Sequence, residues 1–382
     1  MFPRHLYQNA RARHRTRSRL WRLHSDARAH AQRALLRGSR DDARRHRGRP
    51  STGDRGGELD RRGARHVGRG SRRGLALRII DGFWETPRLE RPTALTFGKF
   101  DALHLGHRAV FRSVLDRARV DGVDAAALFL HPNPLKLIAP ERCPASLTSL
   151  SQKFRMFEEM GFDLVIAGRF DERLREAPAR DFLARLVDVF RARVIAVGYS
   201  VRFGYQGRGD LTLLRDQASA LGYEAMAEEA HMCDGEVISS TRIRDAVARA
   251  DFDLAEAMLG RPYALAGEVV EGNRMGRELG FPTANVAYGD MQLPPDGIYA
   301  GYTRHDGVSY PSAISIGNRP TFGGTQVVVE SYLLDFSGDL YGQEVEVELV
   351  ERIREQEKFA SVDALTARIQ DDVRRAREAL AS

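Results

Sequence analysis

A short apolar strand that runs into a glycine-broken loop and then into a helix constrains this chain more than any other feature. The stretch is residues 96–107, Thr-Phe-Gly-Lys-Phe-Asp-Ala-Leu-His-Leu-Gly-His. We expect a strand over Ala94–Phe97 and a helix after the loop. The apolar face of that helix consists of Val110, Val114, Leu115 and Ala118. A unit of this kind points backbone N–H groups at an anion bound where the strand ends.

Two histidines, His104 and His107, stand at the start of this helix with Gly106 between them. The two cysteines of the chain, Cys143 and Cys233, are far away in sequence, so the histidines have no metal-ligand partner nearby. The pattern favours in-line nucleotidyl transfer, in which imidazoles and helix-end amides stabilise charge on an α-phosphate while pyrophosphate leaves. Ordinary loop histidines remain the alternative, because short motifs also match by chance.

Strands and helices alternate from about Leu77 to Gly260, which predicts a parallel sheet with helices on both faces. The expected strands are Ala125–Leu130, Leu164–Ala167 and Val194–Val197, and the expected helices are Phe154–Met160 and Ala179–Phe190. Ligands of such a sheet bind at the carboxyl ends of the strands, where the loop with His104 and His107 falls.

The pattern changes after Gly260. Apolar and polar residues alternate over Glu344–Leu349, which predicts an antiparallel sheet that closes toward a barrel. The chain then ends in a helix, for which Ser361 is the expected N-cap. We expect one apolar face of this helix to pack on the barrel, formed by Val362, Leu365, Ile369, Val373 and Leu380.

Residues 1–75 differ from the rest in charge. They hold 22 of the 59 Lys and Arg residues, all of them arginine, against six acids, whereas the remaining 307 residues have a net charge of −9. Two interpretations stand. The segment is a nucleic-acid or membrane-surface arm, or it is a disordered extension or upstream sequence translated from a wrongly chosen start. We favour the second, because the segment has too little apolar periodicity to repay its ordering entropy.

Two further loops carry candidate phosphate ligands. Gly198–Gly204 follows a predicted strand and contains Arg202, and the alternative for this loop is a solvated turn. Ile238–Arg244 opens a predicted helix with three hydroxyls, Ser239, Ser240 and Thr241, followed by Arg244. Capping of the helix explains one hydroxyl, whereas all three with the arginine fit a phosphate clamp.

The second domain has a glycine-rich basic stretch, residues 272–280, directly before Phe-Pro-Thr-Ala-Asn at residues 281–285. No P-loop motif is present anywhere, so a kinase here belongs to another class. Thr283 and Asn285 are two apart in an extended segment and point to one face, where their oxygens can bind Mg²⁺ and phosphate. Glu330 follows an apolar run and is a candidate base. The alternatives are turn chemistry after Pro282 and an exposed strand residue at Glu330.

In order and spacing, the loop through His107, the Arg202-Phe203-Gly204 loop and Ile238–Arg244 resemble the adenylyltransferase module of the bacterial bifunctional riboflavin kinase/FAD synthetase family. The resemblance extends from about Leu77 to the C-terminus. The second domain contributes the following segments to it: Phe281–Asn285, Gly317–Phe322, Leu334–Gly342 and Arg352–Phe359. It implies an FMN adenylyltransferase domain of the α/β nucleotidyltransferase type over residues 76–260. A riboflavin kinase domain, mostly an antiparallel β-barrel with a C-terminal helix, is implied over residues 261–382.

The resemblance also implies substrates and residue roles. Riboflavin is phosphorylated to FMN, and FMN is adenylylated to FAD, with ATP and Mg²⁺. His104 and His107 would contact the ATP phosphates at the transition state. The other ATP- and phosphate-binding residues implied are Gly98, Phe100, Asp101, Gly106, Arg202, Ser239, Ser240, Thr241, Arg244 and Gly276. Thr283 and Asn285 would bind Mg²⁺-ATP, and Glu330 would activate the ribityl 5′-hydroxyl.

The sequence departs from the family pattern at four positions. Glycine is usual where Ala102 stands, and histidine where Asn133 stands. Ser200 and Val201 replace an acidic or amide residue and a phenylalanine. These changes leave an alternative open, namely a riboflavin kinase whose nucleotidyltransferase domain is impaired or transfers to another acceptor.

We expect the partners to be small-molecule substrates and expect no binding to membranes or nucleic acid. The sequence leaves open whether the protein forms a homo-oligomer. The shortage of cysteines and the absence of a long apolar run favour the cytoplasm.

Overall fold

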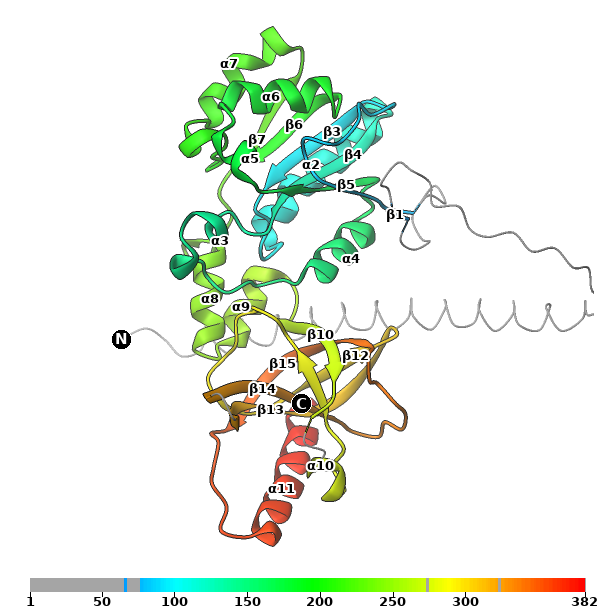
Figure 1. The fold of residues 1–382 in the computed structure, drawn as a ribbon, viewed down its shortest axis with the longest axis vertical. Coiled ribbons are helices and arrows are strands. Elements are labelled where there is room, and N and C mark those ends of the chain that lie inside the picture. The colour runs from blue at the N-terminus through cyan, green and yellow to red at the C-terminus, as the bar shows by residue number, and fades with distance from the viewer. Residues whose placement is uncertain (1–64, 67–75, 273–274, 322–323, 382) are drawn as a thin grey trace, which may run out of the picture. The chain divides into compact units, whose positions relative to one another are not determined.

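The computed structural model describes residues 65–66, 76–272, 275–321 and 324–381. The expectation for residues 1–75 therefore lies outside the described residues, apart from the two residues of β1 (Arg65–His66). The described chain divides into two compact units, with the division at Arg244 and Asp245 (Figure 1).

The first unit contains a seven-stranded sheet in the order β1-β2-β5-β4-β3-β6-β7. Its strands beyond β1 are β2 (Arg78–Asp81), β3 (Thr93–Gly98), β4 (Asp124–His131), β5 (Leu164–Arg169), β6 (Ala192–Gly198) and β7 (Glu224–Glu228). β1 runs antiparallel to β2, and every other neighbouring pair is parallel. The predicted parallel sheet is confirmed.

Helices cover both faces of this sheet, as predicted. One apolar cluster joins the strands to α2 (Leu105–Asp121) and α4 (Leu150–Met160), and a second joins them to α6 (Ala179–Asp188) and α7 (Leu211–Leu221). The remaining elements are α3 (Leu135–Ile138), η1 (Pro140–Arg142), α5 (Glu172–Glu176), η2 (Tyr205–Gly207), β8 (Met232–Cys233), β9 (Glu236–Val237) and α8 (Ser240–Ala248). The face of α2 predicted to be apolar is largely buried, because Val110, Val114 and Ala118 are each less than a tenth exposed.

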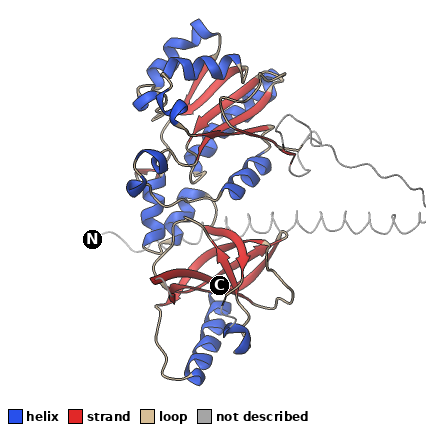
Figure 2. Cartoon of the chain, in the orientation of Figure 1, coloured by secondary structure: helices blue, strands red, loops and turns tan. Residues whose placement is uncertain are grey.

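The second unit is built on a closed barrel in the order β10-β11-β14-β13-β12-β15 (Figure 2). Its strands are β10 (Ala264–Val270), β11 (Ala284–Ala287), β12 (Gly297–His305), β13 (Val308–Thr321), β14 (Gly324–Leu333) and β15 (Glu344–Arg354). All six neighbouring pairs are antiparallel, which confirms the predicted barrel. The helices of this unit are α9 (Phe252–Leu259), α10 (Met275–Glu278) and α11 (Val362–Ala381).

The C-terminal helix α11 forms where it was predicted, and the Ser361 hydroxyl accepts the Ala364 N–H at 3.2 Å as an N-cap does. Its predicted apolar face is only partly right, because Val362 is 62% exposed and the buried residues of the helix are Asp372 and Ala376. Asp372 is buried because it pairs with an arginine of the barrel, a contact that a hydrophobic pattern does not register. No helix in the described part of the chain is long and apolar enough to cross a membrane.

Candidate active sites

The two histidines lie together at the N-terminus of α2. His104 is the N-cap, and its Nδ1 accepts the backbone N–H of His107 at 3.3 Å. The hydrogen of a neutral His104 ring is therefore on Nε2. The two rings stack with centroids 3.7 Å apart and an interplanar angle of 16°. Two imidazole rings thus lie at the positive end of the helix dipole, which suits a phosphate.

The loop that leads to His104 is held by its own apolar residues. Phe100 and Leu103 have left-handed backbone conformations, with φ of 42° and 45°, which a non-glycine residue adopts at a cost. Both side chains are buried, and the Phe100 ring packs edge-on against His107 at 5.3 Å and Phe111 at 4.9 Å. Core packing therefore maintains the strained loop and fixes the His107 ring.

Asp101 connects this loop to the start of α8. Its Oδ1 accepts the Leu147 N–H at 3.1 Å, and its Oδ2 pairs with Arg244. The Arg244 Nε also donates to the Ala145 carbonyl at 2.6 Å. Both side chains of the ion pair are only 13–14% exposed. Two of the predicted phosphate-binding segments, which are far apart in sequence, are thereby brought together.

The predicted hydroxyls have different local roles. The Ser239 hydroxyl accepts the Arg242 N–H at 3.2 Å and so caps α8, which leaves Ser240 and Thr241 in the first turn. Thr241 is exposed. Capping therefore accounts for Ser239, and the next two hydroxyls remain at the open end of the helix.

The Arg202 loop lies beside the end of β3. Phe203 packs on Phe97 with ring centroids 5.3 Å apart, while Arg202 is exposed and pairs with Asp210 at 3.2 Å. The Leu213 N–H, which Asp210 accepts as the N-cap of α7, lowers the pKa of that carboxyl, and Arg202 adds to the effect. The structure thus anchors the loop through Phe203 and leaves the guanidinium at the surface.

In the second unit, two of the predicted kinase residues, Asn285 and Glu330, share one row on the outer wall of the barrel. Asn285 of β11 lies directly opposite Glu330 of β14, and Glu330 lies opposite Ser315 of β13. Directly opposed residues of antiparallel strands point to the same face. The neighbours of these residues along their strands point inward and are less than a tenth exposed: Ala284, Val286, Ile314, Ile316 and Val329. Glu330 therefore faces out of the barrel, beside Asn285.

Two glycines let the preceding loop lie against this face. A Cβ at Gly272 would be 2.4 Å from Asn285 Nδ2, and a Cβ at Gly276 would be 2.5 Å from the Phe281 carbonyl oxygen and 3.2 Å from Thr283 Oγ1. No other residue fits at either position without a shift of backbone or side chain. The backbone at Gly276, in α10, therefore lies close to the Thr283 hydroxyl.

The oxygens at this face suit a magnesium nucleotide. Thr283 and Asn285 offer neutral oxygens from alternate positions of one segment, and Glu330 adds a carboxylate. Among the described residues there is no group of three or more His, Cys, Asp or Glu that could hold a metal by itself. Mg²⁺ commonly binds through few protein oxygens together with substrate phosphates, so the donor set fits that ion.

Comparison with known proteins gives two family matches. The FAD synthetase family model matches residues 86–242, and the riboflavin kinase family model matches residues 259–380. Two bifunctional riboflavin kinase/FMN adenylyltransferases are similar to this chain. The Escherichia coli K12 protein is 39% identical over 74% of this chain and 91% of its own length. The Pseudomonas fluorescens protein is 37% identical over 79% of this chain and 97% of its own length. This chain belongs to the bifunctional riboflavin kinase/FMN adenylyltransferase family.

The chain is accordingly an enzyme of FAD biosynthesis that makes FMN from riboflavin and FAD from FMN, with ATP as the other substrate. A more distant member of the family, from Bacillus subtilis, is 30% identical over 73% of this chain and 90% of its own. A solved structure titled macrolide-efflux protein from Streptococcus pneumoniae superposes with a TM-score of 0.69 at 27% identity, over 79% of this chain and 98% of the other.

The four departures from the family pattern are accommodated locally. Ala102 is fully buried and is not among the residues with positive φ, so its backbone does not require glycine. The Asn133 Oδ1 accepts the Leu135 N–H at 3.1 Å and shapes the start of α3. Ser200 is exposed, and Val201 packs against the apolar cluster between the sheet and the helices α6 and α7.

Three residues near these sites have no assigned role in the sequence analysis. His231 precedes the β8–β9 hairpin, and its Cβ would lie 3.8 Å from a Cβ at Gly106. Ser315 is adjacent to Glu330, and Gln356 donates to the Ser315 hydroxyl at 3.1 Å. Sequence offered a signal only for Gln356, which lies in the Arg352–Phe359 segment, because the other two positions depend on strand register and loop placement.

Proposed function

We propose that residues 76–260 carry out the adenylyl transfer and residues 261–382 the phosphorylation of riboflavin. The limits of the two family models, at residues 242 and 259, support this division. The observation that carries the assignment for the kinase is the register that sets Asn285 opposite Glu330 on the outer face of the barrel, with Thr283 two residues before Asn285. For the adenylyltransferase it is the stacked pair of histidines at the N-terminus of α2.

In the kinase, Glu330 acts as general base. It takes the proton of the ribityl 5′-hydroxyl, whose oxygen then attacks the γ-phosphorus of ATP while ADP leaves. Thr283 and Asn285 hold Mg²⁺ and the phosphates through their side-chain oxygens, and the backbone around Gly276 supplies N–H groups. Bound Mg²⁺ would neutralise phosphate charge as it develops.

In the adenylyltransferase, a phosphate oxygen of FMN attacks the α-phosphorus of ATP, and pyrophosphate leaves. His104 and His107, with the N–H groups of α2, stabilise the charge that develops there. Ser240, Thr241 and Arg244 bind the leaving pyrophosphate, and Arg244 exchanges part of its pairing with Asp101 for that contact. The first loop, with Gly98, Phe100 and Gly106, keeps this arrangement in place, and Arg202 lies near the nucleotide and flavin.

The alternative, a kinase with an impaired or differently specific first domain, receives no support from the backbone at Ala102, which does not need glycine. We also propose that the enzyme works in the cytoplasm without a nucleic-acid partner. Both cysteines are free thiols, in agreement with a reducing compartment.

A pair of variants tests the assignment. Glu330→Gln should slow FMN formation from riboflavin by about 10²–10⁴-fold, the usual contribution of a general base, and leave FAD formation from supplied FMN unchanged. His107→Ala should slow FAD formation by on the order of 10²-fold and leave FMN formation unchanged. Chromatographic separation of the flavins measures both rates in each protein.

The activity that each variant is expected to keep shows that the variant protein is folded. Wild-type rates of FMN formation with Glu330→Gln would rule out Glu330 as the base. Unchanged FAD formation with His107→Ala would remove the histidines from the transfer step.

A further inference from the structure

The segment after β15 returns to the outer wall of the barrel beside Glu330. The Nε2 of Gln356 donates to the Ser315 hydroxyl at 3.1 Å and to the Ile316 carbonyl at 3.2 Å. A backbone carbonyl accepts and never donates, so the contact with Ile316 fixes which end of the carboxamide faces β13. Both N–H groups of Gln356 are then used, and no described residue donates to its Oε1. One acceptor is therefore left beside the predicted base.

The close approach of Gln356 depends on a glycine. A Cβ at Gly317 would lie 2.7 Å from Gln356 Nε2, so a side chain at that position would displace the carboxamide. Gly317 follows Ile316 directly, so one short piece of β13 both makes room for Gln356 and accepts its hydrogen bond.

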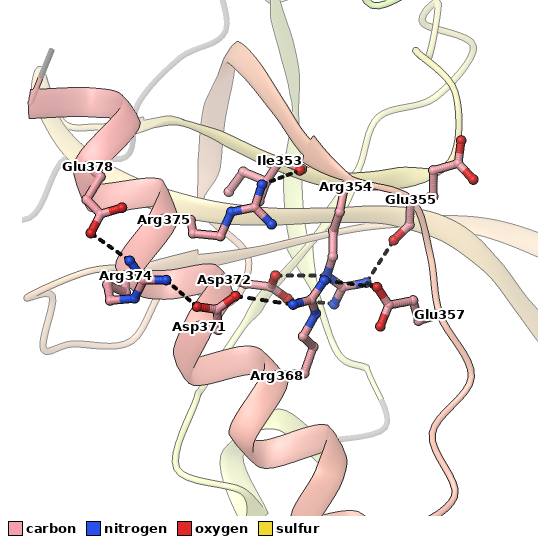
Figure 3. Close-up of polar contacts among 10 residues, drawn as sticks. All are labelled: Ile353, Arg354, Glu355, Glu357, Arg368, Asp371, Asp372, Arg374, Arg375 and Glu378. Atoms are coloured by element: carbon pink, nitrogen blue, oxygen red, sulfur yellow. Dashed lines mark hydrogen bonds and ion pairs between the residues drawn. The ribbon is translucent and has the colours of Figure 1, made fainter.

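Ion pairs hold the backbone on either side of Gln356 (Figure 3). Glu357 contacts Arg368 of α11 at 3.0 Å and Arg354 at 3.8 Å. Arg354 in turn makes two hydrogen bonds with Asp372 of α11, at 2.8 and 2.6 Å, and these two side chains are only 9% and 5% exposed. Although the Gln356 side chain lies at the surface, the segment that carries it is thus fixed to α11.

We propose that Gln356 is a substrate-binding residue of the kinase, whose Oε1 accepts a hydrogen bond from a ribityl hydroxyl farther along the chain than the one that Glu330 deprotonates. The proposal rests on Glu330 as the base. Neighbouring strands are about 4.8 Å apart, so Ser315 lies roughly one strand from Glu330. The Gln356 carboxamide, 3.1 Å from the Ser315 hydroxyl, is thus within reach of the same polyhydroxylated chain. An uncharged acceptor suits an alcohol, because it needs no buried charge.

Gln356→Ala tests this in the full-length enzyme. We expect the KM for riboflavin to rise about tenfold, the equivalent of one lost hydrogen bond, with little change in kcat. The KM for ATP and the rate of FAD formation from supplied FMN should stay as in the wild type. Glu355→Ala is the matched control, since the Glu355 side chain is 84% exposed and its ion pair with Arg352, at 3.8 Å, is long.

A flavin analogue with a hydroxyethyl group in place of the ribityl chain separates binding from a structural effect. The analogue keeps a terminal hydroxyl and lacks the others, so wild type and Gln356→Ala should have the same KM for it. Gln356→Met, which keeps the side-chain length, should behave as Gln356→Ala does.

Two outcomes would overturn the proposal: an unchanged KM for riboflavin in both variants, or an equal rise for riboflavin, the analogue and ATP. The Glu330→Gln variant distinguishes a wrong role for Gln356 from a wrong assignment of the kinase site. An inactive Glu330→Gln kinase together with an unaffected Gln356→Ala kinase would refute the role of Gln356 alone.

Discussion

Ala102 illustrates how much a single residue depends on its backbone. In the loop before His104 the left-handed conformations belong to Phe100 and Leu103, whose buried side chains offset the strain, and Ala102 lies between them without one. A glycine at this position would add freedom to the unfolded chain and remove a fully buried methyl group. The departure from the family pattern at Ala102 is thus compatible with an intact histidine loop.

Ala102→Gly should therefore lower the free energy of unfolding by about 1 kcal/mol without accelerating adenylyl transfer. Urea unfolding and FAD formation from supplied FMN measure the two effects. A several-fold faster transfer in the variant would mean that the alanine does impair this site.

Tyr299 gives the barrel a dependence on alkaline pH. Its ring is fully buried, its hydroxyl donates to the Pro295 carbonyl, and burial raises its pKa from 10.0 to about 12. The unfolded chain ionises first as the pH rises, so the stability from this group is complete below about pH 10 and is lost by about pH 12. Urea midpoints measured across that range should fall less steeply in Tyr299→Phe than in the wild type, and equal slopes would contradict the shift.

At the scale of an element, α11 is attached to the barrel by charge as much as by apolar contact. Ala376 packs on Ile298 and Ile353, and one turn earlier Asp372 forms the buried pair with Arg354. A buried carboxylate needs its partner, because an unpaired charge in such a place costs several kcal/mol. This pair also places the segment that carries Gln356.

Asp372→Asn should destabilise the protein by about 3–5 kcal/mol, because the buried Arg354 loses its close counter-charge and keeps only the longer contact with Glu357, at 3.8 Å. The adjacent Asp371→Asn is the control, because Asp371 pairs with the more exposed Arg374 and Arg368 and its loss should be much smaller than that of Asp372. Urea unfolding compares the two variants. Equal losses would show that α11 does not depend on the buried pair.

At the scale of the molecule, two separate chemistries lie on one chain, and the product of one is the substrate of the other. The net positive charge of the whole sequence comes from residues 1–75, whereas the two catalytic parts together are acidic. An acidic body has no general attraction for anionic flavin nucleotides. Attraction for the phosphates is therefore expected from local groups, such as the N-terminus of α2 in the proposed adenylyltransferase site.

With riboflavin, ATP and Mg²⁺ supplied to the full-length enzyme, FMN should appear first and FAD after it. Flavin chromatography over time follows both products. FMN that accumulates without FAD, even with excess ATP, would restore the alternative of an impaired first domain. A variant lacking residues 1–75 should give the same time course, since both groups of predicted site residues lie beyond residue 75.

Much of the architecture could be predicted because it depends on neighbours along the chain. Hydrophobic period and loop composition indicated the strand and helix around His104 and His107, the parallel sheet and the antiparallel barrel. They also placed Thr283 and Asn285 on one face, since side chains alternate along an extended segment.

Tertiary structure alone decided which distant residues meet. Closure of the barrel set the register that turns Glu330 outward between Asn285 and Ser315. Chain folding brought Asp101 to Arg244, 143 positions away in sequence. Local sequence carries no information on such contacts, because hydrogen bonds across strands and ion pairs between segments form only when the whole chain has packed.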